Sequence, residues 1–206
     1  MPQIDGLFLT QIYQAKLAGK KATRLNKDLR TACLSIARDD RAGQTWCKEN
    51  AYAGYTSYAS LNDLTMRAPQ FKDLELALQP HIDALAQALH FDLAGRKLKL
   101  DSLWINILKP GGAHTGHIHP HSVISGTYYV TAPKGASALK LEDPRLGLMM
   151  SAPAKKPNAP RNQQPFVYID PQPGAIILFE SWLRHEVPAN RSSEDRISVS
   201  FNYASA

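Results

Sequence analysis

The chain has 206 residues, of which 44% are hydrophobic, and its formal net charge is +6. This length supports one sizeable core and argues against two large independent domains. The basic residues are scattered and form no stripe with aromatic side chains, so the charge does not indicate a nucleic-acid partner. Two cysteines do not make a disulfide framework. The sequence lacks both a signal-peptide pattern and the roughly twenty apolar residues of a membrane span. We therefore expect a cytoplasmic protein with neither a membrane segment nor a nucleic-acid partner.

The first 96 residues are expected to form a mainly helical layer. A short apolar strand is predicted around residues 7–12. Apolar residues then recur at intervals of three and four up to Ala37, which predicts a helix with Asn26 as its N-cap. The glycine-, serine- and tyrosine-rich residues 46–58 favour an ordered loop or a short strand over a helix.

A second helical pattern runs from Phe71 to Leu89 and contains a proline. Pro80 lacks a backbone N–H and its ring clashes with the preceding turn of a helix. The sequence therefore predicts either a kink at Pro80 or the start of another helix there.

Residues 97–206 change to strand character. Short segments rich in β-branched and aromatic residues are separated by turns that contain proline and glycine. These segments are KLKLDSLWINILK, VISGTYYV, ALKLED, FVYID, AIILFE and ISVSFNY. Many short strands after helices predict a mainly β, α+β protein, in which a sandwich or jelly roll packs one sheet against the helical layer. We expect one domain over residues 1–206, with residues 143–165 as a long proline-rich loop.

Four of the seven histidines fall within HTGHIHPHS. Alternate residues of a strand share a face, so His117 and His119 can present two imidazoles to one point. His121 has the same parity and could replace His119, whereas His114 is a candidate for a supporting or loop position. Imidazole binds iron, zinc, copper and nickel, so the pair leaves the metal open.

A third ligand has to come from elsewhere in the chain. His185 is the candidate because it lies between the strands AIILFE and ISVSFNY. The other histidines, His81 and His90, fall in the helical half and are expected to be surface or packing residues. The sequence therefore predicts a metal site formed by His117, His119 and His185.

The ordered set of motifs resembles the 2-oxoglutarate- and Fe(II)-dependent oxygenases, in particular an uncharacterised bacterial and phage-associated group. The motifs run from about Leu103 to Tyr203 and comprise WINILKPGGAHTGHIHP, SGTYYV, EDPR, PGAIILFESWLRHEV and RISVSFN. The resemblance implies a double-stranded β-helix that binds Fe(II) and uses 2-oxoglutarate as co-substrate. It implies oxidative decarboxylation of 2-oxoglutarate to succinate, coupled to hydroxylation of a substrate.

The resemblance also implies roles for residues near the metal. Arg196 and Ser198 stand where the family holds the distal carboxylate of 2-oxoglutarate, and a guanidinium suits that contact. Tyr129 corresponds to a strand residue whose hydroxyl often reaches the same carboxylate, with core packing as the alternative. Asn106 is a polar residue on an apolar strand that could contact the co-substrate or be satisfied by the backbone.

One residue departs from the pattern of the superfamily. His119 stands where most members place Asp or Glu, so the metal would keep one more unit of positive charge. A three-histidine cupin-type enzyme that does not use 2-oxoglutarate is therefore a competing interpretation, although the glutamate that usually follows the cupin His-x-His is missing and Arg196 has no role in it. A non-catalytic metal-binding jelly roll is the other.

The motifs leave the substrate open between a small molecule and a protein side chain, and they leave a homodimer open. Trp104 and Trp182 are apolar enough to line a cavity, although core packing is the first expectation for both. Loops such as GYTSYAS and the proline-rich segment are candidates for the substrate contacts.

Overall fold

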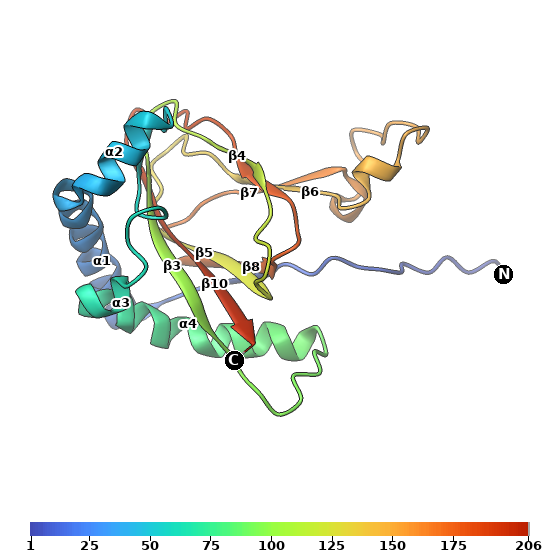
Figure 1. Ribbon diagram of the computed structural model, residues 1–206. Helices are drawn as coiled ribbons and strands as arrows, with labels where there is room; N and C mark the ends of the chain where they lie inside the picture. The colour runs from blue at the N-terminus through green and yellow to red at the C-terminus, as the bar shows by residue number, and fades with distance from the viewer. Residues whose placement is uncertain (206) are drawn as a thin grey trace.

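The computed structural model describes residues 1–205 and contains two antiparallel sheets with helices on one side (Figure 1). The first sheet has six strands in the order β1-β8-β5-β10-β3-β2, and the second has four in the order β4-β9-β6-β7. The strands of the first sheet are β1 (Tyr13–Lys16), β2 (Gly54–Thr56), β3 (Leu98–Leu108), β5 (Ile124–Thr131), β8 (Ala175–Glu180) and β10 (Arg196–Ser205). Those of the second are β4 (His114–His117), β6 (Leu139–Glu142), β7 (Phe166–Ile169) and β9 (His185–Val187). The predicted jelly roll with a helical layer is confirmed.

The helices are α1 (Gly19–Asp39), α2 (Arg41–Glu49), α3 (Leu64–Arg67) and α4 (Pro69–Ala88). Helix α4 buries a stripe at intervals of three and four, formed by Phe71, Leu74, Leu78, Ile82 and Leu85. The stripe joins the core between the helices and the six-stranded sheet. The predicted helix is thus confirmed, and it runs through Pro80, so the alternative of a new helix at that residue is wrong.

Helix α1 begins earlier than predicted. Asn26 lies inside the helix rather than at its N-cap. Its side chain faces the six-stranded sheet, where its Nδ2 donates to the carbonyl of Val130 at 2.9 Å and its Oδ1 accepts from the hydroxyl of Tyr128 at 3.0 Å. The prediction of Asn26 as an N-cap is therefore wrong, because its side chain bonds to the sheet instead of capping the helix.

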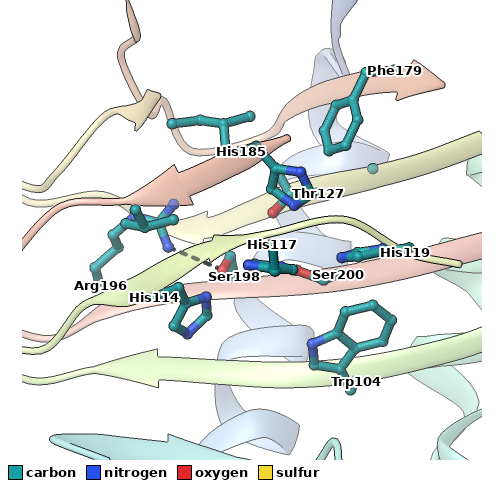
Figure 2. A pocket seen from close by; sticks show the side chains of 13 residues that line it. Trp104, His114, His117, His119, Thr127, Phe179, His185, Arg196, Ser198 and Ser200 are labelled. Atoms are coloured by element: carbon teal, nitrogen blue, oxygen red, sulfur yellow. Dashed lines mark hydrogen bonds between the residues drawn. The ribbon is translucent and has the colours of Figure 1, made fainter. Parts of the chain in front are cut away.

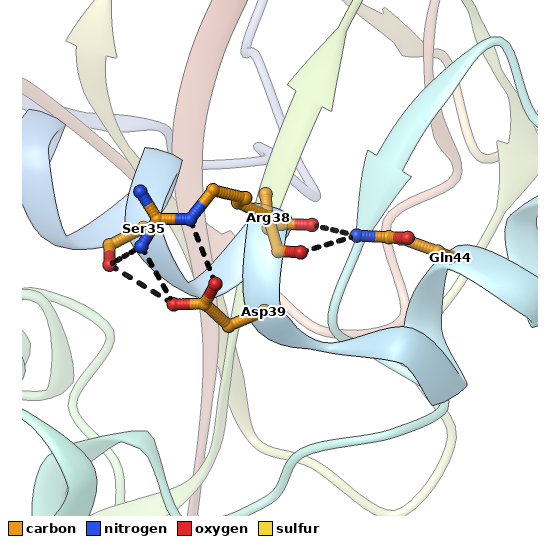
Figure 3. A network of polar contacts seen from close by, with 5 residues as sticks. Ser35, Arg38, Asp39 and Gln44 are labelled. Carbon is orange, nitrogen blue, oxygen red and sulfur yellow. Dashed lines mark hydrogen bonds and ion pairs between the residues drawn. The ribbon is translucent and has the colours of Figure 1, made fainter.

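The connection between α1 and α2 is closed by a side chain from the second helix. Gln44 donates from Nε2 to the carbonyls of Ala37 and Arg38, at 2.7 and 2.9 Å (Figure 3). The last carbonyls of a helix have no partner within the helix, so this amide satisfies two of them. Arg38 itself pairs with the exposed Asp39.

The helix α2 also corrects the prediction for residues 46–58, whose first four residues are helical and not loop.

Two other predictions for local structure are resolved. Residues 7–12 form no strand but an extended arm that runs away from the body of the molecule, and the strand begins at Tyr13 instead (Figure 1). The proline-rich segment between β6 and β7 is a loop as expected, and it holds two short 3-10 helices, Leu146–Leu148 and Arg161–Gln163.

The six-stranded sheet separates an apolar face from a polar one. Along β10, Ile197, Val199 and Phe201 are buried in the core shared with the helices. The alternate residues Arg196 and Ser198 face the second sheet and line a cavity between the two sheets. The period-two pattern of a strand therefore places one half of the RISVSFN motif in the core and the other half in the cavity.

None of the helices in residues 1–205 combines the length and the hydrophobicity that a bilayer span needs.

Candidate metal and co-substrate site

Three histidine side chains meet in the cavity between the sheets (Figure 2). His117 ends β4, His185 begins β9, and the two are register partners across the antiparallel pair. His119 lies two residues beyond β4, where its backbone N–H donates to the carbonyl of Ser181 at 2.9 Å. The ring centroids are separated by 4.4 Å for His117 and His185, 5.1 Å for His117 and His119, and 5.0 Å for His119 and His185. The predicted cluster is assembled, with one ligand atom from each ring within 4.8 Å of the others.

The hydrogen bonds around the cluster fix the tautomer of each imidazole. Nδ1 of His117 lies 2.7 Å from the carbonyl oxygen of Thr115, and Nδ1 of His185 lies 2.8 Å from that of Leu183. Nδ1 of His119 lies 2.6 Å from the amide oxygen of Asn202. A carbonyl oxygen only accepts, so each Nδ1 carries the proton and each Nε2 keeps a lone pair. Three imidazoles with a free lone pair on Nε2 are suitable ligands for a divalent metal ion.

Burial favours the neutral form of two of these imidazoles, those of His119 and His185. Desolvation lowers the pKa of His185 to about 3, and the neighbouring imidazoles act in the same direction. Desolvation also lowers the pKa of His119. A metal binds the neutral imidazole, so the cavity holds these ligands in the form that coordination requires.

His119 and His121, the two candidates for the second ligand, lie in different places. His121 is exposed and its backbone has a φ of 72°, in the turn that follows HIHP. It is outside the cluster that His119 joins. His81 lies on α4 and its Nδ1 is hydrogen-bonded to the hydroxyl of Tyr13 at 2.8 Å, as expected for a packing histidine.

A hydrogen-bond network behind His119 was not predicted. The amide oxygen of Asn202 accepts from Ser125 Oγ at 2.7 Å as well as from His119, and Asn202 Nδ2 donates to Ser102 Oγ at 3.0 Å. Ser125 Oγ also lies 2.7 Å from Ser181 Oγ. The signal in the sequence was the continued alternation of polar residues along β10, which places Asn202 on the same face as Arg196 and Ser198.

Arg196 lies deeper in the same cavity and has no acidic partner. Its side chain is 1% exposed, and within residues 1–205 no carboxylate lies within 4.0 Å of it. Nη1 donates to Ser198 Oγ at 3.1 Å, Nε donates to the carbonyl of Ser137 at 3.3 Å, and the guanidinium lies 4.9 Å from the centre of the Tyr129 ring. A buried charge is costly without an opposite charge. The site is therefore built for an anionic ligand.

Tyr129 and Asn106 differ in how far their polar atoms are satisfied. The hydroxyl of Tyr129 is buried without a hydrogen-bond partner in the described chain. Burial raises its pKa, against the opposing effect of Arg196. Asn106 Oδ1 instead accepts from Thr56 Oγ1 at 3.0 Å, and its Nδ2 donates to Ser200 Oγ at 3.0 Å. Ser200 lines the cavity, so Asn106 lies one residue behind the wall.

The rest of the wall is mostly apolar. Phe179, Leu139 and Val187 line it with Thr127, and Trp104 stands 5.6 Å from the His119 ring. Trp182 is 46% exposed, so it neither packs in the core, which was the first expectation, nor lines the cavity. The cavity can thus hold a metal ion, an anion beside Arg196 and an apolar group near Trp104.

Comparisons with known proteins agree with this chemistry. A family described as "Putative 2OG-Fe(II) oxygenase" matches residues 102–202, which contain all three histidines and Arg196. The predicted resemblance to the 2OG-Fe(II) oxygenases is confirmed over these residues. The enzyme is therefore an Fe(II)- and 2-oxoglutarate-dependent oxygenase, and the cupin-type and non-catalytic interpretations are set aside.

Solved structures share the fold of the oxygenase. A prolyl-4-hydroxylase from Pseudomonas putida is 17% identical, with a TM-score of 0.62 over 95% of this chain and 93% of that chain. The α-ketoglutarate-dependent epimerase SnoN from nogalamycin biosynthesis is 14% identical, with a TM-score of 0.62 over 95% of this chain and 76% of that chain. A 2OG-Fe(II) oxygenase family protein from Burkholderia pseudomallei matches over only 53% of this chain and 46% of that chain, with 15% identity and a TM-score of 0.42. The first two support the double-stranded β-helix.

A comparison with curated proteins finds no significant match to the oxygenase.

Proposed function

We propose that His117, His119 and His185 bind the Fe(II) ion and that Arg196 and Ser198 hold the distal carboxylate of 2-oxoglutarate. The enzyme would then hydroxylate a substrate that enters the apolar part of the cavity. The observation that carries this proposal is a buried guanidinium, with no acidic partner within residues 1–205, on the wall of the cavity that holds the three imidazoles. The three imidazoles supply only neutral ligands, so the anionic co-substrate would offset the charge of the metal.

The co-substrate pocket is polar where the carboxylate would lie. Ser198 Oγ already accepts from Arg196 and can donate its own proton to a carboxylate oxygen. The unpartnered hydroxyl of Tyr129 can donate a further hydrogen bond. Asn106 would act through Ser200, whose hydroxyl it holds toward the cavity.

The bound iron supplies the redox chemistry, in which dioxygen decarboxylates 2-oxoglutarate to succinate and carbon dioxide while one oxygen atom hydroxylates the substrate. The protein holds the metal, orients the co-substrate and excludes water from the oxidant. Trp104 and Phe179, which are 8% and 2% exposed, are the side chains that would keep water out on the substrate side.

The related structures share the fold but do not give the class of substrate. One of them is a prolyl-4-hydroxylase and another is an α-ketoglutarate-dependent epimerase from nogalamycin biosynthesis, so the same fold hosts different reactions. We propose hydroxylation of a small molecule or a protein side chain. Residues 1–96 and 97–206 would act as one domain, because the helical layer covers the outer face of the sheet that carries Arg196.

Replacing Arg196 with Ala tests the proposal. We expect the Kd for 2-oxoglutarate to rise roughly 10- to 150-fold, the equivalent of about 1.5–3 kcal/mol for a charge-assisted hydrogen bond. The visible charge-transfer band that develops when 2-oxoglutarate is added to the Fe(II)-loaded protein without oxygen measures this Kd. Fe(II) affinity, measured by anaerobic calorimetry, should stay at the wild-type value because Arg196 does not contact the metal.

The matched control is Arg184→Ala. Arg184 is next to His185 in sequence, but its exposed side chain pairs with Glu142 at 3.3 Å. This variant should bind 2-oxoglutarate like the wild type. An equal loss of Fe(II) and 2-oxoglutarate binding in Arg196→Ala would contradict the assigned role.

A further inference from the structure

One side chain of the helical half contacts a residue that lines the cavity, and the chemistry above does not use this contact. The hydroxyl of Tyr52, from the segment between α2 and β2, hydrogen-bonds to Nε2 of His114. The two ring centroids are 5.4 Å apart. His114 begins β4 and lines the cavity together with Arg196 and Ser198 (Figure 2).

Two glycines allow the segment that carries Tyr52 to pack closely against the neighbouring backbone. Gly54 has a φ of 150°, and a Cβ at this position would stand 1.9 Å from the carbonyl oxygen of Ile107. A Cβ on Gly112 would stand 2.3 Å from the carbonyl oxygen of Ala53. The segment that carries Tyr52 therefore packs backbone to backbone against the end of β3 and the turn before β4. Such close packing fixes the position of the Tyr52 ring.

The proton in the Tyr52–His114 contact can be placed. Burial raises the pKa of the Tyr52 hydroxyl, so the phenol keeps its proton. Within residues 1–205 this hydroxyl has no polar partner other than His114, and it therefore donates to Nε2. A neutral imidazole that accepts at Nε2 carries its own proton on Nδ1.

The second ring nitrogen of His114 has no hydrogen-bond partner in the described part of the chain, whereas the Nδ1 atoms of His117, His119 and His185 all have one. This N–H belongs to a residue that lines the same cavity as the buried Arg196, and it is free to donate to a ligand there. A carboxylate bound by Arg196 would provide that acceptor.

We propose that His114 is a further co-substrate-binding residue, which donates its Nδ1–H to the distal carboxylate of 2-oxoglutarate, and that Tyr52 is a positioning residue that sets its tautomer. This inference rests on the proposed role of Arg196. It also gives the helical layer a part in co-substrate binding, since Tyr52 belongs to that layer.

The experiment measures 2-oxoglutarate binding to Zn(II)-loaded protein by calorimetry, because zinc has no redox chemistry and so cannot turn over the co-substrate. Tyr52→Phe removes one oxygen atom and should raise the Kd roughly 3- to 10-fold, as expected for the loss of one neutral hydrogen bond. His114→Leu removes the donor itself and should raise the Kd roughly 10- to 100-fold. The double variant should bind no more weakly than His114→Leu alone, because Tyr52 acts through His114.

Tyr13→Phe is the matched control. It removes another tyrosine–histidine hydrogen bond, between Tyr13 and His81, on the helical side of the six-stranded sheet. Its Kd for 2-oxoglutarate should equal that of the wild type. Nitrogen-15 NMR of the imidazoles gives a second readout, in which His114 should be protonated at Nδ1 in the wild type and should shift toward a mixture of tautomers in Tyr52→Phe.

The possible outcomes separate this inference from the function on which it rests. If the wild-type protein binds 2-oxoglutarate and Tyr52→Phe binds it equally well with an unchanged His114 tautomer, this inference is overturned and the role of Arg196 stands. If Arg196→Ala also binds 2-oxoglutarate like the wild type, the proposed anion site itself is wrong. Tyr52→Phe keeps the ring and its packing, so it decides the matter even where His114→Leu does not fold.

Discussion

The two faces of β10 belong to one strand but carry different parts of the molecule. The outer face packs against the helices through Ile197, Val199 and Phe201, each at most 2% exposed. The inner face holds the residues to which we assign the binding or positioning of ligands, namely Arg196, Ser198, Ser200 and Asn202. Neighbouring residues of a strand point to opposite faces. One residue of β10 therefore contributes to the stability of the fold, and the next contributes to the chemistry of the cavity. Substitutions in adjacent residues should therefore have separable effects.

Phe201→Ala should have the largest effect, and on stability alone. Phe201 is fully buried and packs edge-to-face with Tyr203 at a centroid distance of 6.0 Å. Removing its ring should lower the free energy of unfolding by about 3–5 kcal/mol, because the lost contacts leave a cavity. Urea unfolding monitored by circular dichroism measures this loss. The fraction that stays folded should bind Fe(II) with wild-type affinity.

Ser200→Ala is the neighbouring control on the inner face. It leaves Nδ2 of Asn106 without its acceptor and should cost only about 1 kcal/mol of stability. Equal losses of stability in Phe201→Ala and Ser200→Ala would contradict the separate roles of the two faces. Weaker metal binding in folded Phe201→Ala would contradict them as well.

Asn202→Ala should have the next largest effect, and on metal affinity. Without the amide oxygen, Nδ1 of His119 keeps only Ser125 Oγ, at 2.9 Å, and the ring loses the shorter hydrogen bond that helps to direct Nε2 toward the other two imidazoles. We expect the Kd for Fe(II) to rise about 10- to 100-fold, which is usual for the partner of a metal-binding histidine. Anaerobic calorimetry measures it.

Asn202→Asp supplies the matching rescue. The carboxylate oxygen accepts from the same Nδ1–H, so metal affinity should recover most of what Asn202→Ala loses. A purely structural role for Asn202 would instead predict that both variants bind Fe(II) with wild-type affinity once they are folded.

The alternation along β10 shows which parts of the site were predictable from sequence. Parity on a strand and a preference for metal ligands were sufficient to predict His117 as a ligand and to put Arg196 and Ser198 on one face, because both are local rules. The resemblance to the oxygenases, and not parity, put that face beside the metal. The apolar stripe of α4 was predictable for the same reason, because apolar residues recur at intervals of three and four within the helix itself.

The missing parts depend on contacts between distant residues. Asn202 lies 83 positions from His119, and Tyr52 lies 62 positions from His114. Parity gives the face on which a side chain lies, but the partner that it meets depends on how the two sheets and the helical layer pack. The choice of His119 over His121 likewise depended on a turn at positive φ, which the spacing of the histidines does not reveal.

The smallest predicted effect is on the pH dependence of stability, which should arise from the inner face and not from the outer one. Burial, followed by the charge of Arg196 and the proximity of His117, lowers the pKa of His114 to about 3. In the unfolded chain the same imidazole takes up a proton below about pH 6.5. The folded state thus binds fewer protons than the unfolded state between these values, so stability is fully present above about pH 6.5 and falls as the pH is lowered toward 3.

The three outer-face residues Ile197, Val199 and Phe201 have nothing to titrate, so this dependence should come from the cavity. For metal-free protein, His114→Gln should remove a slope of at most about 1.4 kcal/mol per pH unit from the free energy of unfolding, measured in urea at about pH 7.5, 6.5 and 5.5. His121→Gln changes an exposed histidine outside the cluster and should leave the slope as it is. If His114→Gln and the wild type lose stability in parallel as the pH falls, the imidazole of His114 is not held neutral by the cavity. The acid sensitivity of the fold would then have to arise elsewhere, for instance at the other buried imidazole, His185.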